Sequence, residues 1–384
     1  MKRINTHQFK LGIIGGGQLG KMIAQAASRW DIKTHILDPD ENCPSSETCT
    51  AVHIGSPLSY DDILEFGKKV DLITFEIENV NIESLKELKK QGLPIYPDPN
   101  AMELIQDKGL QKNFYAEHNF KTADYQLFEG TADIIKAAED GQFDFPFVQK
   151  LRKGGYDGKG VQVIKDKSSL SKLLPGPSLV ETAVKIDKEL SVIASRNPSG
   201  EIKCFPTVEM DVDAEANLVD MLICPAKISQ EIATQATEVA SRLIEELDVC
   251  GLLAVEFFLD TQGELWINEV APRPHNSGHH TIESVLTSQF EQLIRAVLDF
   301  PLGSTALKMP AAMINLLGSP DHTGLTQYVG VEDALKIEGL YIHIYGKATT
   351  SPYRKMGHVT LISPSLDEAI SNAKIAKQTL KVIA

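Results

Sequence analysis

Residues 252–279 read LLAVEFFLDTQGELWINEVAPRPHNSGH, two apolar runs joined by a short turn and followed by a polar loop. The run 252–260 is typical of a buried strand, and 264–270 is predicted to be its hairpin partner. This pairing would make Glu256 and Glu269 facing carboxylates. A carboxylate in an apolar strand must be paired, protonated or bound to a cation. Two of them on neighbouring strands therefore predict a magnesium and phosphate site.

The loop APRPHNSGHH strengthens this interpretation, because it carries a guanidinium and imidazoles between prolines directly behind the strand. Such a loop is suited to anions and metal ions. The alternative is that each glutamate faces water or pairs with a lysine, which is the better interpretation of either acid alone. The two acids and the loop together favour a metal and phosphate site.

Composition limits the possible classes of function. A chain of 384 residues with 42% hydrophobic and 23% charged residues is an ordinary globular protein of two or three domains. Its net charge of -14 repels nucleic acid and anionic membranes, so neither is expected as a partner. The five cysteines are scattered without CxxC spacing, which is typical of reduced thiols in a cytoplasmic protein. No apolar run approaches the roughly 18 residues that a membrane span needs.

The first hundred residues alternate apolar runs with amphipathic segments. The pattern predicts a parallel sheet with crossover helices, with strands at 11–14, 33–37 and 72–75 and helices at 19–30, 60–68 and 82–90. Three prolines in 93–100 indicate a domain boundary there.

Beyond this boundary the pattern changes. Helical segments are expected over 101–118, followed by short strands with glycine-rich connections to about residue 205, and helices at 230–247 and 289–298. The last part predicts strands at 311–316, 340–345 and 355–362 and a closing helix at 366–380.

The stretch GGGQLG at 15–20 fits G-x-G-x-x-G between a strand and a helix, and Asp38 has the offset of a ribose-binding acid. Alone, this pattern indicates an NAD-dependent oxidoreductase. The physical chemistry of the pattern is less specific than that. Glycines let a ligand approach the backbone, and a helix N-terminus favours an anion, so a phosphate on any small ligand would fit. The alternative is that the glycines serve only a tight turn.

A second glycine-rich segment, KLRKGGYDGKG at 150–160, combines four cations with four glycines and predicts a loop that closes over phosphates. It differs from a Walker A loop, and a solvated basic hairpin tip is the alternative. Polar residues at strand ends are also candidates, although each alone is more often a surface residue: Glu76, Glu78, Asn79, Glu181 and Glu189. In the C-terminal segment a cluster flanks a loop and could bind phosphate, with a basic surface patch as the alternative: Lys347, Arg354, Lys355 and His358.

Together, GGYDGKG, Glu181 with Glu189, the VEFF strand, INEVAPRPHNSGHH, and YGK followed by RKMGH resemble the ATP-grasp superfamily, and within it the N5-carboxyaminoimidazole ribonucleotide synthetases. The resemblance covers nearly the whole chain, and APRPHNSGH is its most specific part. It implies an α/β and α+β fold in three parts and a homodimer. These parts are a Rossmann-like domain at 1–99, an ATP-grasp domain at 100–298 with a mobile lid at about 120–185, and a C-terminal domain at 299–384 that completes the active site.

The resemblance also implies a reaction, the ATP-dependent carboxylation of 5-aminoimidazole ribonucleotide with bicarbonate through carboxyphosphate, in purine biosynthesis. It assigns magnesium to Glu256, Glu269 and Asn268. It assigns ATP to Lys108, Lys150, Gly155, Tyr156, Asp157, Gly158, Lys159, Gly160, Glu181, Thr182, Ala183, Val184, Glu189, Asn268 and Glu269. Substrate binding falls to Gly17, Gln18, Leu19, Glu76, Asn79, Arg273, His275, Asn276, Ser277, Lys347 and Arg354, and catalysis to Arg273, His275, Tyr156 and Asp157.

The chain departs from the family pattern at two points. Val161 precedes Gln162 after GKG, which puts any role of that glutamine in doubt, and no histidine lies near Glu209 to contact the adenine. Three other functions compete with the carboxylase: an NAD-dependent oxidoreductase, a non-catalytic metabolite-binding protein with an ATP-grasp shell, and a formate-dependent formyltransferase. If the chain were an oxidoreductase, the glycine-rich loop at 150–160 and the two glutamates, Glu256 and Glu269, would have no role.

Overall fold

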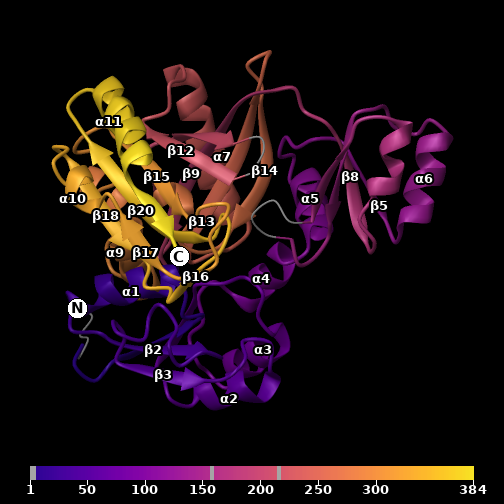
Figure 1. The fold of residues 1–384 in the computed structure, drawn as a ribbon. Helices are drawn as coiled ribbons and strands as arrows, with labels where there is room; N and C mark the ends of the chain where they lie inside the picture. Colours follow the sequence, from indigo (N-terminus) through magenta and orange to yellow (C-terminus); the bar gives the residue numbers. More distant parts are fainter. Residues whose placement is uncertain (1–5, 156–159, 214–217) are drawn as a thin grey trace.

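The computed structural model describes residues 6–155, 160–213 and 218–384. Three sheets organise them: a parallel N-terminal sheet, a small antiparallel sheet that stands out to one side, and a large sheet between the two (Figure 1). No helix in the described part of the chain is both long and apolar enough to cross a membrane.

The N-terminal sheet is parallel in the order β3-β2-β1-β4, as the alternating pattern predicts. The sequence analysis missed β3, which is short and only partly buried and therefore lacks a continuous apolar run. The strands are β1 (Lys10–Ile14), β2 (Lys33–Asp38), β3 (Ala51–Ile54) and β4 (Leu72–Phe75), and the helices are α1 (Gln18–Ser28), α2 (Tyr60–Gly67) and α3 (Ile82–Lys90).

The segment 101–118 is helical, as predicted, and it divides into two helices. It contains most of α4 (Pro99–Ile105) and all of α5 (Lys108–Glu117). Asp107 separates them, because its carboxylate accepts hydrogen bonds from the backbone N–H groups of Gly109 and Leu110 and so caps a new helix. The break places Lys108 in the first turn of α5.

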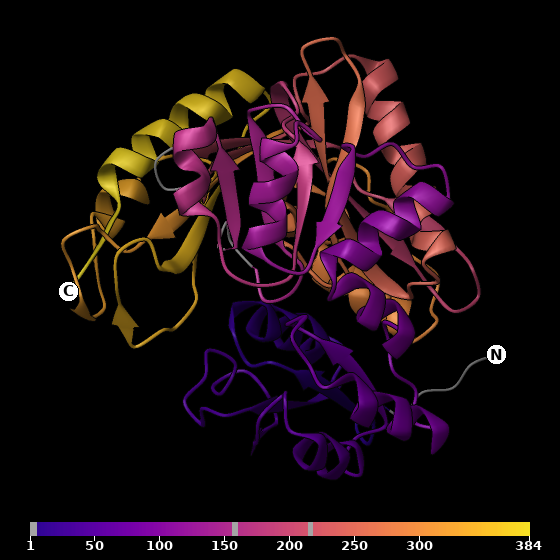
Figure 2. The same cartoon turned by 90° about the vertical axis from the view of Figure 1, so that its right-hand side faces the viewer.

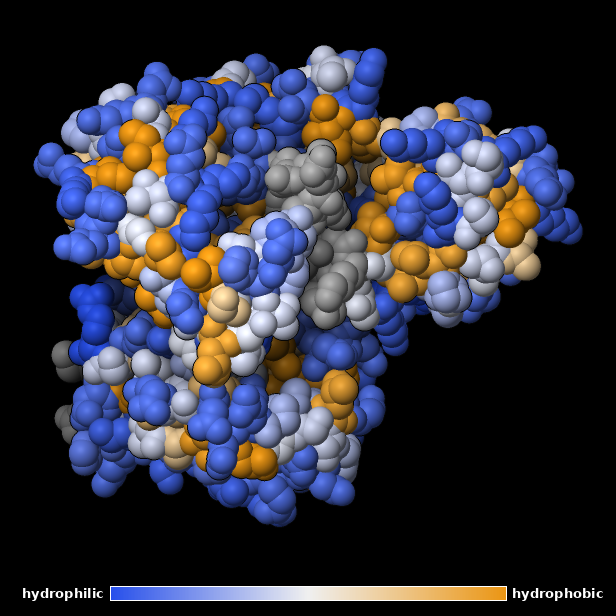
Figure 3. Space-filling view, viewed as in Figure 1, coloured by the Kyte–Doolittle hydropathy of each residue, from blue (hydrophilic) through white to orange (hydrophobic). Residues whose placement is uncertain are grey.

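The small sheet has the order β5-β8-β6-β7, and with its helix it forms a lobe that protrudes from the rest of the molecule (Figure 1, Figure 3). Its core gathers Phe147, Ile164 and Val180 beneath Ile134. The elements are β5 (Tyr125–Phe128), α6 (Thr131–Glu139), β6 (Phe147–Leu151), β7 (Val161–Ile164), the 3-10 helix η1 (Lys167–Lys172) and β8 (Ser178–Thr182).

The large sheet runs in the order β14-β13-β9-β11-β12-β15-β20-β18, so strands from the last quarter of the chain extend the sheet that carries the glutamate hairpin. The predicted strands and helices after residue 205 are confirmed within a few residues. The strands are β9 (Ile186–Arg196), β10 (Ile202–Cys204), β11 (Val208–Asp213), β12 (Leu218–Cys224), β13 (Gly251–Asp260), β14 (Leu265–Ala271), β15 (Ala311–Leu317), β18 (Leu340–Ile344) and β20 (Lys355–Ile362).

Helices α7 (Gln230–Glu246), α9 (Gln289–Val297) and α11 (Leu366–Thr379) pack on this sheet. The remaining elements are short: η2 (Asn276–Gly278), α8 (Thr281–Ser284), β16 (Gly324–Leu325), β17 (Gln327–Val329), α10 (Val331–Ala334), β19 (Thr349–Thr350) and β21 (Lys381–Ile383).

One apolar core joins the N-terminal unit to the large sheet. Leu19 and Ile23 of α1 pack against Phe290 and Ile294 of α9, and the ring of Trp30 stacks on Phe300 at 5.7 Å. In both views the N-terminal unit therefore lies directly against one side of the central body (Figure 1, Figure 2). This packing brings the carboxyl ends of β1 and β4 towards the loop that follows β14.

Candidate active site

The glutamate hairpin forms as predicted. Strands β13 and β14 are antiparallel, and Glu256 lies directly opposite Glu269. The Glu269 side chain is 39% exposed and that of Glu256 18%, so both can reach a ligand. The amide Nδ2 of Asn268 donates to Oε2 of Glu256 at 3.4 Å. Three oxygen-bearing side chains thus meet on adjacent strands.

A lysine and a histidine contact the two acids. Lys108 Nζ forms an ion pair with Glu269, and His275 Nε2 lies 3.3 Å from Glu256 Oε1. Burial, and next the charge of Glu269, raise the pKa of Glu256. Burial acts in the same direction on Glu269, but the charge of Lys108 outweighs it and lowers the pKa of this carboxyl. Two close carboxylates that need positive partners are suited to a divalent cation.

Two further lysines meet a third acid beside the hairpin. Glu181 at the end of β8 lies 2.5 Å from Lys150 Nζ and 2.8 Å from Lys112 Nζ, and Lys150 also donates to Asn268 Oδ1 at 2.8 Å. These contacts connect the small sheet to the large one. Lys108, Lys112 and Lys150 therefore converge on the hairpin from two different elements.

The sequence analysis did not single out Lys112. It lies one helical turn after Lys108 on α5, so the two ammonium groups share a face, and this i, i+4 spacing was the available signal. The side chain of Lys112 is only 3% exposed and that of its partner Glu181 only 4%. The pair is therefore deeply buried.

We expect Lys112→Ala to lower the free energy of unfolding by about 3 kcal/mol, because removing one partner leaves a buried carboxylate with less compensation. Urea denaturation followed by circular dichroism measures this loss. Lys121→Ala is the matched control, since Lys121 pairs with Glu264 at an exposed position and should contribute less than about 1 kcal/mol. Equal stability of the two variants would contradict the prediction.

The glycine-rich loop joins β6 to β7. At its base Gly160 has φ +81°, a Cβ there would approach Gly155 Cα to 3.1 Å, and Gly160 C=O accepts from Leu151 N–H at 2.8 Å. Gly155 and Gly160 therefore lie side by side. Tyr156, Asp157, Gly158 and Lys159 are outside the described residues.

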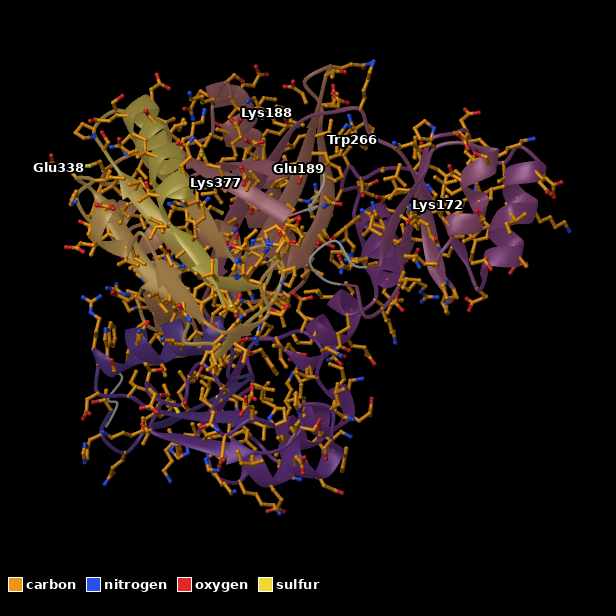
Figure 4. All side chains as sticks on the ribbon, viewed as in Figure 1. Lys172, Lys188, Glu189, Trp266, Glu338 and Lys377 are labelled. Carbon is orange, nitrogen blue, oxygen red and sulfur yellow. The ribbon has the colours of Figure 1, made fainter. Side chains whose placement is uncertain are left out.

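The segment between β8 and β9 connects the small sheet to the large one. Thr182 lies at the end of β8, Ala183 and Val184 follow, and Val184 C=O accepts from Ile186 N–H at 3.1 Å. Glu189 lies on β9 beside Phe258, and burial raises the pKa of its carboxyl. Figure 4 shows Glu189 and Trp266 on the part of the large sheet nearest the lobe that carries Lys172.

The glycine stretch after β1 surrounds a buried acid from β4. Gly17 caps α1, and a Cβ on it would lie 2.4 Å from Glu76 Oε1. Gln18 is half-buried at the start of α1, and Leu19 points into the core, so only its backbone can face a ligand. Glu76 is 7% exposed and accepts weakly from Gly20 N–H at 3.4 Å.

Burial raises the pKa of Glu76 to about 7, although Arg273 acts in the opposite direction. Because the folded-state pKa exceeds the unfolded one, the protonated acid stabilises the fold fully below about pH 4.5. This contribution disappears as the pH rises to about 7.

We therefore expect Glu76→Gln to raise the free energy of unfolding by about 3 kcal/mol at about pH 8 and to change it little at about pH 4. Denaturant titrations at the two pH values measure the difference. The exposed Glu47→Gln serves as a control for the loss of one charge. If the free energies of unfolding of wild type and Glu76→Gln differed by the same amount at both pH values, the raised pKa of Glu76 would not be the cause of the difference.

Asp38 does not lie free for a ribose. Its Oδ2 accepts from Gly16 N–H at 2.7 Å, and its Oδ1 accepts from Asp40 N–H at 2.9 Å. A Cβ on Gly16 would also meet Cys43 Sγ at 2.4 Å. The Asp38 carboxylate is thus bound by backbone N–H groups of the chain itself. This is evidence against a dinucleotide site and therefore against the oxidoreductase.

Arg273 connects the polar loop with the N-terminal unit. Its Nη2 lies 2.8 Å from Glu78 Oε1, and Gln106 Nε2 donates to the backbone carbonyls of Glu78 and Val80 at 2.7 and 2.9 Å. Glu78 therefore orients the guanidinium. Its position after β4 had made it a candidate site residue in the sequence. Asn79 is exposed.

The remaining predicted loop residues hold the loop together. The amides of Asn276 and Asn315 bond reciprocally at 2.8 and 3.3 Å, which ties the loop to β15. Ser277 is buried, and its hydroxyl faces Nδ1 of His275 at 2.8 Å.

The C-terminal cations lie on the far side of Glu76. Lys347 Nζ donates to Lys355 C=O at 2.7 Å and, like Arg273, acts electrostatically on Glu76. Arg354 is exposed, and its Nη1 donates to Thr349 C=O at 2.5 Å. His358 is buried against Tyr345, so it does not join this cluster.

In the described ranges 6–155, 160–213 and 218–384, no group of three or more His, Cys, Asp or Glu side chains has metal-binding geometry. A cation at the hairpin would therefore depend on two carboxylates, the Asn268 amide and ligand oxygens. Near Glu209, where the family histidine is missing, the carboxylate pairs with Lys188 at 2.6 Å. Within the described ranges, Gln162 Nε2 donates to the carbonyl of Val163.

Three known protein-family domains match successive parts of the chain. The ribonucleotide synthetase preATP-grasp domain matches residues 8–106, the ATP-grasp domain 113–290, and the phosphoribosylaminoimidazole carboxylase C-terminal domain 311–372. The chain is 37% identical to the N5-carboxyaminoimidazole ribonucleotide synthase of Bacillus subtilis over 94% of this chain and 93% of that protein. It spans about two thirds of the longer phosphoribosylaminoimidazole carboxylases that it matches.

Comparison with solved structures indicates the same family. The N5-carboxyaminoimidazole ribonucleotide synthetase of Thermotoga maritima superposes with a TM-score of 0.90 at 40% identity, covering 98% of this chain and 100% of that one. An Aspergillus clavatus synthase in complex with ADP and 5-aminoimidazole ribonucleotide gives 0.87 at 28% identity, covering 97% and 98%. The chain belongs to the N5-carboxyaminoimidazole ribonucleotide synthetase family of ATP-grasp ligases.

Proposed function

We propose that the chain carboxylates the exocyclic amine of 5-aminoimidazole ribonucleotide with bicarbonate, using ATP and releasing ADP and phosphate. The observation that carries this proposal is that Lys108 pairs with Glu269, which lies opposite Glu256, while Lys150 donates to the neighbouring Asn268. Anionic oxygens of a triphosphate need such cations, and its metal needs such carboxylates. Family membership names the reaction to which this geometry belongs.

ATP would lie between the small and the large sheet. Lys108 and Lys150 would contact its phosphates, and the loop based on Gly155 and Gly160 would close over them. Tyr156, Asp157, Gly158 and Lys159 of that loop would complete the cover. The segment Thr182, Ala183 and Val184, with Glu181, would border the adenine through backbone and side-chain groups, and Glu189 would bind the ribose.

Magnesium would be held by Glu256, Glu269 and Asn268, where it would neutralise phosphate charge. The fit rests on the donor set of the hairpin, in which two opposed carboxylates lie beside an amide, with Lys108 paired to Glu269 and His275 Nε2 in contact with Glu256. When ATP binds, Lys108 is then available to its phosphates.

The chemistry proceeds in two displacements. An oxygen of bicarbonate attacks the γ-phosphorus, the bond to ADP breaks, and carboxyphosphate forms. The amine then attacks the carboxyl carbon, the bond to phosphate breaks, and the amine loses a proton to give the carbamate. Arg273 would stabilise the carboxyphosphate, and closure of the loop would exclude water from both steps.

The ribonucleotide would lie across the junction of the N-terminal unit and the C-terminal strands. Gly17, Gln18 and the backbone of Leu19 would receive it with Glu76 and Asn79, and Lys347 and Arg354 would bind its phosphate. Asn276 and Ser277 would support this pocket from behind. With the proposed division into domains at 1–99, 100–298 with a lid at about 120–185, and 299–384, the substrate would lie between all three.

We also propose a cytoplasmic homodimer. The cytoplasmic assignment rests on the five free thiols, and the dimer on the family resemblance. Sedimentation measures the mass directly, and a monomer at micromolar concentration would contradict the dimer.

An assay of ADP release with and without aminoimidazole ribonucleotide and bicarbonate tests the function. We expect release to need magnesium and both substrates. Release that ignores both would leave only an ATPase, and release that needs formate instead of bicarbonate would identify a formyltransferase.

A further inference from the structure

The ring of His275 has a defined hydrogen-bond direction. The backbone N–H of Ser277 donates to Nδ1 at 3.3 Å, and the hydroxyl of Ser277 lies 2.8 Å from the same nitrogen. A backbone N–H can only donate, so Nδ1 is the acceptor. In the neutral ring the proton is then on Nε2, the nitrogen that faces Glu256.

A second buried serine stands behind this contact. Ser191 on β9 is fully buried, and its Oγ lies 2.9 Å from the Oγ of Ser277. A serine hydroxyl has one proton. Because the proton of Ser277 points to Nδ1 of His275, its oxygen accepts the proton of Ser191. The two hydroxyls form a chain with one direction, from Ser191 through Ser277 to the imidazole.

The backbone of His275 is fixed as well. Gln289 is fully buried at the start of α9, its Oε1 accepts from His275 N–H at 2.9 Å, and its Nε2 donates to His275 C=O at 2.8 Å. Both main-chain polar groups of the residue are thus bound by one side chain. The ring position is set by Gln289, and the hydroxyl chain sets which nitrogen carries the proton.

We infer that Ser191 is a positioning residue that, through Ser277, keeps the proton of His275 on Nε2, so that His275 presents a hydrogen-bond donor to the reacting oxygens. This inference rests on the proposed function. A ring with its proton on Nε2 can orient the substrate, but it cannot remove a proton from the amine with that nitrogen. Ser191 itself lies behind the site and contacts no substrate.

The same strand offers a matched control. Ser195 is four residues further along β9 and equally buried, but its hydroxyl donates to Lys203 C=O at 2.7 Å and contacts Gln292 Nε2 at 3.3 Å. Gln292 in turn clamps the backbone of Gly303, as Gln289 clamps His275. Ser195→Ala therefore removes a buried hydroxyl of the same strand without touching the chain to His275.

The test combines steady-state kinetics with ¹⁵N spectroscopy of the His275 ring in wild type, Ser191→Ala, Ser195→Ala, Ser277→Ala and the double variant Ser191→Ala/Ser277→Ala. Losing one hydrogen bond of the chain should lower kcat by about fivefold to tenfold in Ser191→Ala, with KM for ATP unchanged. The double variant should be no slower than Ser277→Ala alone, because both changes break the same chain. Ser195→Ala should match wild type in kcat and spectrum.

The spectrum of the wild type should show one neutral form with the proton on Nε2, and Ser191→Ala should show a mixture. A wild-type ring with the proton on Nδ1, equal kcat in Ser191→Ala and Ser195→Ala, or additive effects in the double variant would each overturn the inference. If Ser191→Ala does not fold, the wild-type spectrum and Ser277→Ala still decide. A wild type without bicarbonate-dependent ADP release would instead remove the proposed function, and the spectrum would still report the hydroxyl chain.

Discussion

Glu269→Gln is expected to lower kcat/KM for ATP by about 10³-fold, because the amide keeps the shape of the side chain but removes the charge that a magnesium nucleotide needs. The loss has a second source. Lys108 pairs with Glu269 and would lose the carboxylate that holds it at the hairpin. Calorimetric titration with magnesium and ATP should show the same loss in binding, which separates it from a defect in carboxyl transfer.

Glu264→Gln is the matched control for this prediction. Glu264 precedes β14 on the same hairpin, but its side chain is 53% exposed and pairs with Lys121 in solvent. Activity within about twofold of wild type is expected, since exposed pairs contribute little. If Glu269→Gln also stayed within this range, the acid pair would not be the nucleotide site.

Arg273→Ala should give the second large effect, a fall in kcat of about 10²-fold to 10³-fold with the fold intact. Arg273 is held by Glu78 and acts on Glu76, so it reaches the ribonucleotide side of the site as well as the loop. Removing it takes away the cation assigned to carboxyphosphate. Single-turnover measurement of carbamate formation checks the effect on the chemical step.

The exposed Arg29→Ala controls for the loss of a guanidinium, since Arg29 only pairs with Glu291 across α1 and α9 at 3.4 Å. Circular dichroism and melting temperature must agree between Arg273→Ala and wild type. Near-normal turnover by a folded Arg273→Ala would take Arg273 out of the chemistry. Arg273→Lys should recover only part of the activity, because lysine lacks the planar donor pair.

Local pattern predicted much of the fold because each element carries its own signal. The parallel N-terminal sheet followed from short apolar runs separated by amphipathic helices, and the β13–β14 hairpin from two apolar runs around a glycine turn. Prediction failed where an element carries little signal of its own, since β3 has too little burial to show an apolar run. The cap at Asp107, which separates α4 from α5, was not located in advance either.

The residues of the candidate site also differ in how far the sequence could predict them. Glu256 and Glu269 could be paired in advance because a hairpin register is fixed by its turn, and the motif around His275 marked the polar loop. Ser191 and Gln289 could not be found, since neither belongs to a motif and each acts through a contact that exists only in the folded chain. Lys112 had only its i, i+4 spacing from Lys108 as a signal, and its partner Glu181 lies on a different element.

The sequence by itself determined the elements, the opposed acids and the family, because all three are written in spacings within one segment or in motifs of a few residues. Only the tertiary structure decided which polar groups meet: that Lys108 pairs with Glu269 and His275 contacts Glu256, that Glu181 lies between two lysines, and that Asp38 binds the backbone of its own glycine loop. The physical reason is that charges act over a few ångströms in a buried environment. Residues as far apart in the chain as Lys108 and Glu269 come within that distance only when the sheets have packed.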